Sequence, residues 1–230
     1  AGESLVRQCL YGQRFFRREL GVEVRVGWLP DVFGFTWSMP QIYKEAGLDY
    51  FMTTKLSWND TNKFPYGLFW WEGIDGTRLF TSFVNGSYSA MVKPKEMLKL
   101  WDSYPNKHDY PELLSPFGWG DGGGGPTREM LEAIPRLSDL PGLPKARMGR
   151  VHDFFDRAAA ETSDLPVWNG ELYFELHRGT YTSQARNKRS NRKSELLYRE
   201  AEMLCAFAAP FGKPYPDRKS VVEGKSVDIG

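Results

Sequence analysis

The chain has 230 residues, of which 41% are hydrophobic, so it is long enough to bury a sizeable core without help from a disulfide or a metal. Its 30 basic residues balance 29 acidic ones, giving a formal net charge of +1, which gives no electrostatic reason to expect nucleic acid or an acidic membrane surface as a partner. No run of 18 apolar residues and no signal-peptide pattern occurs, so neither a membrane span nor a secretion signal is expected.

Both ends of the chain have unusual patterns. Residues 1–20 begin without an initiator methionine and directly on a helical pattern. The last segment, residues 217–230, has no capping or core pattern and resembles a translated sequencing-adapter read, so we predict that it is non-native. We therefore expect the chain to be an internal fragment of a longer protein.

The pattern between these ends predicts an α/β fold. "VEVRVGWLP" (22–30) is a predicted strand, "SMPQIYKEAGL" (38–48) a helix closed by Gly47, and "DYFMTTKLSW" (49–58) a second strand. This order indicates a parallel βαβ unit, in which active sites collect at the carboxyl ends of the strands. Asp31 follows the first strand at that end. Residues 68–84 then read as a hairpin turned at Asp75-Gly76.

The second half continues the alternation. A helix is predicted over 93–106, and an apolar strand-like segment, 113–120, leads into Asp121 and four glycines. Pro126-Thr127 opens the next helix, and an amphipathic helix lies within 141–166. A strand from residue 167 leads to a loop around His177. The basic helix over about 183–208 is expected to begin a second, helical domain.

Three residues are candidates for chemistry on context alone. Asp31 and Asp121 each follow an apolar run and precede glycine-rich backbone, so each is either a turn or cap residue or a catalytic carboxylate. Two such carboxylates suit glycoside hydrolysis. His177 is either a core histidine or a ligand, whereas His108 and His152 lie in polar surroundings and are predicted to be on the surface. The glycine run lacks both GxxxxGK[ST] and GxGxxG, which disfavours a nucleotide site.

Six blocks of the sequence carry a family resemblance. "GESLVRQCLYGQRFF", "VGWLPDVFGFTWSMPQI", "DYFMTTKLSWNDTNKFPYG", "FWWEGIDGTR", "FGWGDGGGGPTREML" and "NGELYFELHRGTYTSQARNKR" together resemble the α-mannosidases of glycoside hydrolase family 38, of the bacterial and cytosolic type. The resemblance runs in family order from residue 1 to about 216. It implies residues 1–182 as the C-terminal part of a (β/α)7-type barrel catalytic domain, 183–216 as the start of a helical bundle, and 217–230 as the non-native tail.

The resemblance also implies a retaining, zinc-dependent α-mannosidase that removes terminal α-linked mannose from oligosaccharides. In that family the aspartate of the "WLPDVFG" block is both the nucleophile and a zinc ligand, which corresponds to Asp31. The general acid/base corresponds to Asp121 in "FGWGDGGGG", and a further zinc ligand to His177 in "ELHRGTY".

The chain departs from the family pattern at the metal. The family uses four protein ligands, two of them in an HxD motif, and no HxD occurs here. The remaining Zn2+ ligands are therefore expected upstream of this fragment, which by itself should bind zinc poorly and should not hydrolyse mannosides. Cobalt could serve the same carboxylate and imidazole ligands.

Five more residues are predicted to bind substrate. Trp28 and Phe33 could stack on a pyranose, with aromatic core packing as the alternative. Lys55 could bind a mannose hydroxyl or be an exposed loop lysine. Trp58 and Asp60 could line the pocket, although residues 59–62 also read as ordinary turn chemistry.

The predicted partner is a mannose-containing oligosaccharide, with no nucleic acid and no membrane; the basic run 186–193 reads as a solvated helix face. Homo-oligomerisation of the full-length protein stays open. The cytoplasm is the expected location, from the family branch and from two cysteines, Cys9 and Cys205, without a CxxC pattern. Two alternatives stay open: a metal-dependent carbohydrate deacetylase-like hydrolase, and a non-catalytic sugar-binding module.

Overall fold

The computed structural model describes residues 2–215, which fall into two compact units. The first, Gly2–Arg178, contains every strand, and the second begins at Gly179. The segment predicted to be adapter-derived, 217–230, lies outside the described residues. Within 2–215, no helix is both long and apolar enough to span a bilayer.

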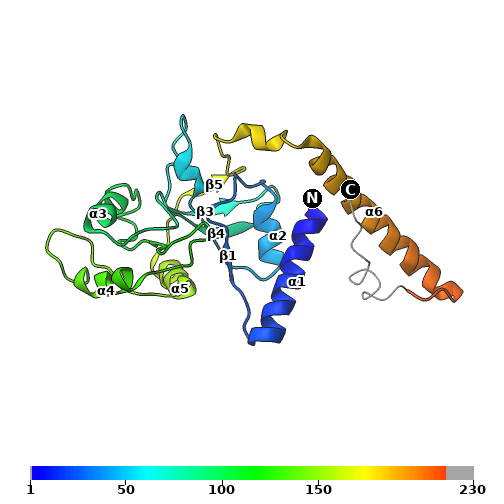
Figure 1. The fold of residues 1–230 in the computed structure, drawn as a ribbon, viewed down its shortest axis with the longest axis horizontal. Coiled ribbons are helices and arrows are strands. Elements are labelled where there is room, and N and C mark those ends of the chain that lie inside the picture. Colours follow the sequence, from blue (N-terminus) through cyan, green and yellow to red (C-terminus); the bar gives the residue numbers. More distant parts are fainter. Residues whose placement is uncertain (1, 216–230) are drawn as a thin grey trace. The chain divides into compact units, whose positions relative to one another are not determined.

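The first unit follows the predicted order of elements (Figure 1). Its N-terminal half consists of α1 (Gly2–Leu20), β1 (Val26–Trp28), α2 (Met39–Glu45), β2 (Tyr50–Thr53), the 3-10 turn η1 (Lys55–Trp58), β3 (Leu68–Glu72) and β4 (Arg78–Phe83). Its C-terminal half consists of α3 (Pro94–Asp102), α4 (Arg128–Arg136), α5 (Val151–Glu161) and β5 (Val167–Asn169). The predicted helices at these positions are confirmed.

The strands form one five-stranded sheet in the order β1-β2-β4-β3-β5. β1, β2 and β4 run parallel, so the predicted βαβ unit is confirmed. β3 pairs antiparallel with β4 across the Asp75-Gly76 turn, where Gly76 adopts φ +84, and the predicted hairpin is confirmed as well. β5 is parallel to β3 at the far edge. The described residues thus form an open mixed sheet covered by helices.

Both faces of the sheet are buried, because successive strand side chains point in opposite directions. Phe51, Phe69 and Trp71 lie on the face covered by α1 and α2. Tyr50 and Met52 lie on the opposite face, against α5 (Figure 1). Phe51 and Trp71 have no exposed surface, and burying a large apolar side chain of this kind contributes roughly 1.5–3 kcal/mol.

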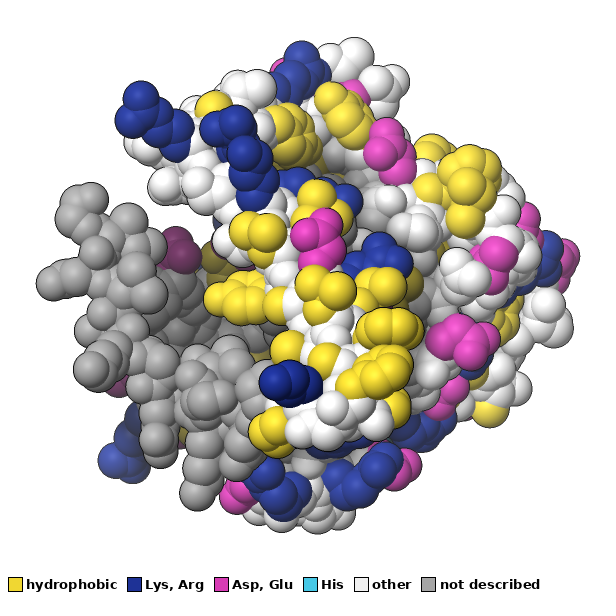
Figure 2. All heavy atoms as spheres, turned by 90° about the vertical axis from the view of Figure 1, so that its right-hand side faces the viewer, with side chains coloured by type: hydrophobic (Ala, Val, Ile, Leu, Met, Phe, Trp, Pro, Cys, Tyr) yellow, Lys and Arg dark blue, Asp and Glu magenta, His cyan; other side chains and the backbone are white. Residues whose placement is uncertain are grey.

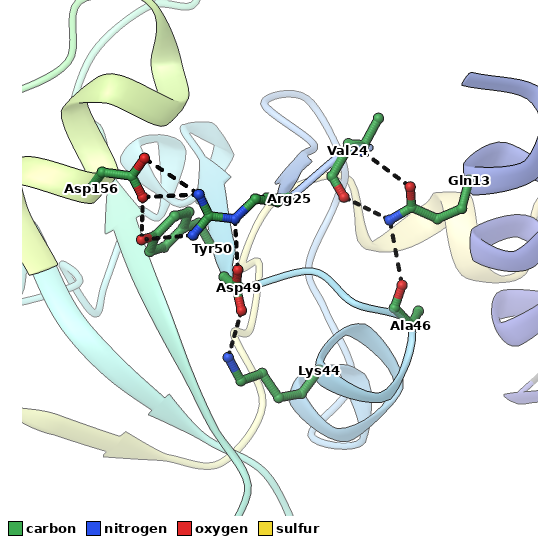
Figure 3. A network of polar contacts seen from close by, with 8 residues as sticks. All are labelled: Gln13, Val24, Arg25, Lys44, Ala46, Asp49, Tyr50 and Asp156. Atoms are coloured by element: carbon green, nitrogen blue, oxygen red, sulfur yellow. Dashed lines mark hydrogen bonds and ion pairs between the residues drawn. The ribbon is translucent and has the colours of Figure 1, made fainter. Parts of the chain in front are cut away.

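A polar network holds the amino ends of β1 and β2 (Figure 3). Arg25, just before β1, donates to Asp49, just before β2, at 2.8 Å, and to Asp156 of α5 at 3.1 Å. Gln13 of α1 exchanges two hydrogen bonds with the backbone of Val24. Two helices and two strands are therefore joined at this end.

The prediction of a strand over residues 113–120, before Asp121, is wrong. Residues 113–120 form only two isolated bridges, Ala90 with Phe117 and Trp119 with Gly125. Pro116 has no N–H for a strand ladder, and Gly118 adopts φ +109, outside the strand region. Asp121 therefore lies on a small closed loop.

The second unit contains η2 (Arg178–Tyr181), α6 (Ala185–Ala208) and η3 (Ala209–Phe211). α6 confirms the long basic helix predicted there. It also exposes large apolar side chains, and hydrophobic groups lie beside basic ones at the surface in the space-filling view (Figure 2). The exposed apolar residues of α6 are Leu196, Leu197, Tyr198, Met203, Leu204 and Phe207.

Candidate active site

Asp31 lies beyond the carboxyl end of β1, as predicted. The chain leaves β1 with Leu29 donating to the carbonyl of Met52, and the carbonyl of Pro30 accepts from the hydroxyl of Thr54 at 2.9 Å. These bonds tie the segment before Asp31 to the end of β2. The Asp31 side chain keeps 43% of its surface exposed, so this carboxylate is available to a ligand.

Lys55 is buried and paired with Asp31. Its Nζ donates to Asp31 Oδ1 at 2.7 Å, and its side chain is only 8% exposed. The ammonium lies 4.0 Å from the ring centroid of Trp58 and 5.0 Å from that of Phe33. A carboxylate and two aromatic faces thus offset the desolvation of the charge. The alternative of an exposed loop lysine is wrong.

His177, which is far from Asp31 in the sequence, lies beside the same two aromatic rings, those of Phe33 and Trp58. A bridge between Phe35 and Leu172 holds the loop after Asp31 against the segment that leads to His177. The His177 ring lies 5.0 Å from that of Phe33 and 5.7 Å from that of Trp58. The side chain is exposed and the backbone is left-handed, with φ +56, so the alternative of a core histidine is wrong.

Glu175 anchors this segment, and sequence reasoning missed it. It is 4% exposed and accepts hydrogen bonds from the backbone N–H groups of Thr61 and Asn62 and from the Asn62 side chain. Burial by itself raises the pKa of Glu175, but the hydrogen bonds from Asn62 and Thr61 outweigh it and lower the pKa to about 2. Asn59 bonds the Tyr173 carbonyl and accepts from the Glu175 N–H. The 59–62 turn is therefore fastened to the His177 segment.

Asp121 is presented on a tight glycine loop. Trp119 and Gly125 exchange two backbone hydrogen bonds of 2.8 Å, which close the loop. Asp121 is exposed and left-handed, with φ +55, a conformation that aspartate tolerates better than most residues. A Cβ on Gly120 would lie 2.3 Å from Ser89 Oγ and 2.8 Å from the Tyr88 ring, so only glycine lets the loop approach these residues.

Tyr88 lies against the loop that carries Asp121, since a Cβ on Gly120 would meet its ring at 2.8 Å, and it too was missed. The pKa of its phenol is raised by burial and by the negative charges of Asp31 and Asp121. The phenol therefore senses the charge of both candidate carboxylates. Tyr88 lies in the polar stretch "NGSYSA", where no periodicity or motif sets it apart.

The remaining predicted substrate residues lie at the surface. Trp28 ends β1 and is 41% exposed, and Trp58 is 53% exposed. Asp60 is exposed. Exposed aromatic rings beside a carboxylate are a feature of sugar-binding sites, since a pyranose face stacks on them. His108 and His152 are exposed, as predicted, and contact none of the site residues named above in any recorded ring or ion-pair interaction.

The candidate metal ligands do not complete a zinc site by themselves. Asp31 and His177 offer the carboxylate and imidazole groups that zinc binds. Within residues 2–215, however, no three His, Cys, Asp or Glu side chains are placed to hold a metal ion. A protein zinc site needs three or four ligands, so Asp31 and His177 would supply only part of one.

The sequence matches one family along nearly its whole length. Residues 1–171 match the glycosyl hydrolases family 38 N-terminal domain, and residues 175–224 match the alpha mannosidase middle domain. Alpha-mannosidase G of Dictyostelium discoideum is 43% identical over 212 residues, and an alpha-mannosidase of Saccharomyces cerevisiae is 42% identical over 227. Alpha-mannosidase 2C1 of Homo sapiens is 41% identical over 209 residues. These alignments cover 92%, 94% and 90% of this chain, but it spans only about a fifth of each relative.

Two solved structures share the fold. An alpha-mannosidase from Enterococcus faecalis V583 superposes on 75% of the chain with a TM-score of 0.57 and 23% identity, covering 20% of that protein. A family 38 glycosyl hydrolase from Enterococcus faecalis superposes on 95% of the chain with a TM-score of 0.61 and 20% identity, covering 23% of that protein. These two structures show the fold alone, and the match of residues 1–171 shows that the chain belongs to glycosyl hydrolase family 38.

Proposed function

We propose that this chain is the catalytic segment of a retaining α-mannosidase, with Asp31 as nucleophile and Asp121 as general acid/base. The observation that carries the proposal is the exposed Asp31 carboxylate beyond the carboxyl end of β1, which the buried Lys55 ammonium holds at 2.7 Å while lying 4.0 Å from the exposed ring of Trp58. Two carboxylates gathered from separate loops are what glycoside hydrolysis needs. The curated relatives of known function are named as alpha-mannosidases.

In the proposed reaction, an Asp31 oxygen attacks the anomeric carbon of a terminal mannose. The bond to the leaving oxygen breaks as Asp121 donates a proton to that oxygen, and a mannosyl ester forms on Asp31. Asp121 then takes a proton from water, the water attacks the anomeric carbon, and Asp31 leaves as a carboxylate. Lys55, 2.7 Å from Asp31, holds the carboxylate in one orientation.

The exposed rings of Trp28 and Trp58, with Phe33 and Asp60, are proposed to bind the mannose. The substrate is proposed to be an oligosaccharide with terminal α-linked mannose, in a cytoplasmic protein. In the same proposal the five strands belong to a (β/α)7-type barrel, and α6 begins a helical bundle.

Zinc dependence is part of the proposal. Asp31 and His177 would be two of the ligands, and further ligands would have to come from outside the described residues, because those residues hold no third group. When bound, the ion would neutralise the charge of the Asp31 carboxylate and bind hydroxyls of the mannose. The isolated chain is accordingly expected to bind Zn2+ weakly, and equilibrium dialysis against a chelator of known affinity measures this. Tight one-to-one binding of Zn2+ would refute the proposal that this chain supplies only part of the zinc ligands.

A chimera tests the proposed roles in this sequence. The segment replaces its counterpart in the S. cerevisiae alpha-mannosidase, to which it is 42% identical, and release of nitrophenol from the aryl α-mannoside is measured. We expect Asp31→Ala to lower kcat at least about a thousandfold, as loss of a nucleophile does. Asp121→Ala should lower it by about a hundredfold or more.

Asp139→Ala is the matched control, because Asp139 is an exposed aspartate paired only with Lys145 among the recorded ion pairs. It should leave kcat unchanged. Full activity in Asp31→Ala would overturn the assignment. A folded chimera that cleaves no mannoside but deacetylates an acetylated sugar would favour the deacetylase-like alternative, and mannose binding that survives Asp31→Ala without turnover would favour the binding module.

A further inference from the structure

A cavity lies away from the candidate active site. Its volume is about 510 Å3, within the roughly 300–1,000 Å3 of small-molecule sites. It is lined by residues of α3, α4 and α5 and by the connections 111–117 and 144–150. None of Asp31, Lys55, Tyr88, Asp121 and His177 lines it, so it is independent of the proposed mannosidase activity.

Most of the wall is apolar. Side chains from three helices and two connections meet there with no serine-, asparagine- or glutamine-rich surface of the kind that would bind a sugar. The principal apolar lining residues are Met97, Leu100, Trp101, Phe117, Ile134 and Phe154. A ligand that fills this space must therefore bring an apolar body.

The charged part of the wall is strongly basic. It contains Lys145, Arg147, Arg150 and Arg157 and a single acidic residue, Glu112. The four cations against one anion give the lining a formal charge of +3. The local field thus favours an anion over a neutral or cationic ligand.

Glu112 binds the two arginines with which an incoming anion would pair. Its two oxygens accept from Arg157 at 2.5 Å and from Arg147 at 2.7 Å. Burial raises the pKa of Glu112, but the hydrogen bonds from the two arginines outweigh it, so the pKa is lowered. The Nε of Arg157 is buried without a hydrogen-bond partner among the described residues and does not face the cavity, so the guanidinium is held at the wall through its bond to Glu112.

We infer that this cavity binds a small amphipathic organic anion, with a carboxylate or similar head group at Arg147 and Arg157 and a hydrocarbon body among Trp101, Phe117 and Phe154. The apolar wall desolvates the body, and the arginines replace the water around the head group. Neither half of the lining explains the other, since an apolar ligand would make no contact with the excess positive charge and a bare anion would leave the apolar wall wet.

The test uses the 230-residue chain and three probes: sodium octanoate, 1-octanol and sodium acetate. Binding is followed by the 1H–15N shift of the Trp101 indole, assigned with Trp101→Phe, with the Trp28 indole as a remote reference. Octanoate should shift the Trp101 signal with a Kd at least about tenfold lower than that of either fragment, as expected for one charge-assisted hydrogen bond.

Two variants should change octanoate affinity in opposite directions. Arg147→Met removes one head-group donor and should weaken binding about tenfold, whereas Glu112→Gln removes the competing charge and should strengthen it several-fold. Arg136→Met is the control, because Arg136 is 80% exposed on α4 and does not line the cavity. Circular dichroism confirms that each variant is folded.

Equal affinity for octanoate and octanol would overturn the inference, and this comparison needs no variant. So would the absence of any octanoate shift at Trp101, or a folded Arg147→Met chain that binds as tightly as wild type.

Discussion

The two ends of β1 and β2 are built for different tasks. At the amino ends, Arg25, Asp49 and Asp156 satisfy one another across separate elements (Figure 3). At the carboxyl ends, Asp31 is 43% exposed and Asp121 is exposed on its loop. Ligands of open α/β sheets bind at the carboxyl ends of strands, so assembly and candidate chemistry are separated by strands of three and four residues.

Backbone strain also differs between the amino and carboxyl ends of these strands. Among the described non-glycine residues, positive φ occurs at Val92, Asp121, His177 and Gln184. Two of these four are candidate site residues, and none lies at the amino ends of the strands. A non-glycine residue in this conformation costs of order 1–3 kcal/mol, and such strain is concentrated where a side chain must be aimed. Substitutions at the carboxyl ends should therefore affect turnover, and those at the amino ends stability.

After loss of Asp31 or Asp121 itself, the largest effect on turnover is expected from Gly120→Ala. The added Cβ would meet Ser89 Oγ at 2.3 Å and the Tyr88 ring at 2.8 Å, so the loop and Tyr88 must move apart. A displacement of this kind should lower kcat of the chimera by about tenfold to a hundredfold. Gly149→Ala, with no heavy atom within 4 Å of its Cβ, is the control. An unchanged kcat in Gly120→Ala would show that the approach of the loop to Tyr88 does not matter.

An effect of intermediate size, on thermal stability, is expected from Glu175→Gln. Glu175 lies two residues before His177 but is expected to stabilise the fold and not to take part in turnover. The folded pKa of Glu175 is about 2, against an ordinary value of 4.5. Its ionised form therefore stabilises the fold above about pH 4.5, and this contribution disappears as the pH falls from 4.5 to 2. Glu175→Gln should lower Tm by several degrees at pH 7 and by much less at pH 2.5.

Glu171→Gln serves as its control, because Glu171 is exposed four residues earlier, and its Tm should follow wild type throughout. Thermal melts from pH 2.5 to 7 measure both. A Tm difference between Glu175→Gln and wild type that does not change with pH would contradict the role given to the ionised carboxylate.

The smallest effect is expected from Arg25→Met. Its side chain is 44% exposed, so solvent screens its ion pairs and the free energy of unfolding should fall by about 1 kcal/mol or less. The loss should shrink in 1 M salt, while kcat of the chimera stays unchanged. Arg78→Met, which removes the single recorded ion pair with Glu72, gives the baseline for urea unfolding. A fall in kcat without a fall in stability would mean that the two ends are not separate.

Local patterns predicted most of the fold. The βαβ unit and the Asp75-Gly76 hairpin are encoded within short stretches, because periodicity and turn chemistry act over a few residues. The strand before Asp121 was predicted wrongly, since hydrophobicity was weighed above Pro116 and the glycines that interrupt pairing. The closed barrel and the helical bundle remain predictions.

The sequence named candidate residues for the site but not the contacts among them. Asp31 and Asp121 are candidates from context and from family motifs and remain predictions, whereas the ion pair of Lys55 with Asp31 joins residues 24 positions apart. Glu175 was read as part of a strand, although the turn it fastens is 113 residues away. Long-range pairing of this kind leaves no periodic signal in a single sequence.

The most direct measurement traps the proposed intermediate. The active chimera is treated with an activated fluorosugar of mannose, digested, and its peptides are weighed by mass spectrometry. The proposed mechanism predicts one fluoromannosyl group on the peptide that contains Asp31, none on the Asp121 peptide, and none in the Asp31→Ala chimera. A label on a different carboxylate, or steady turnover of the reagent with no labelled peptide, would contradict Asp31 as the nucleophile.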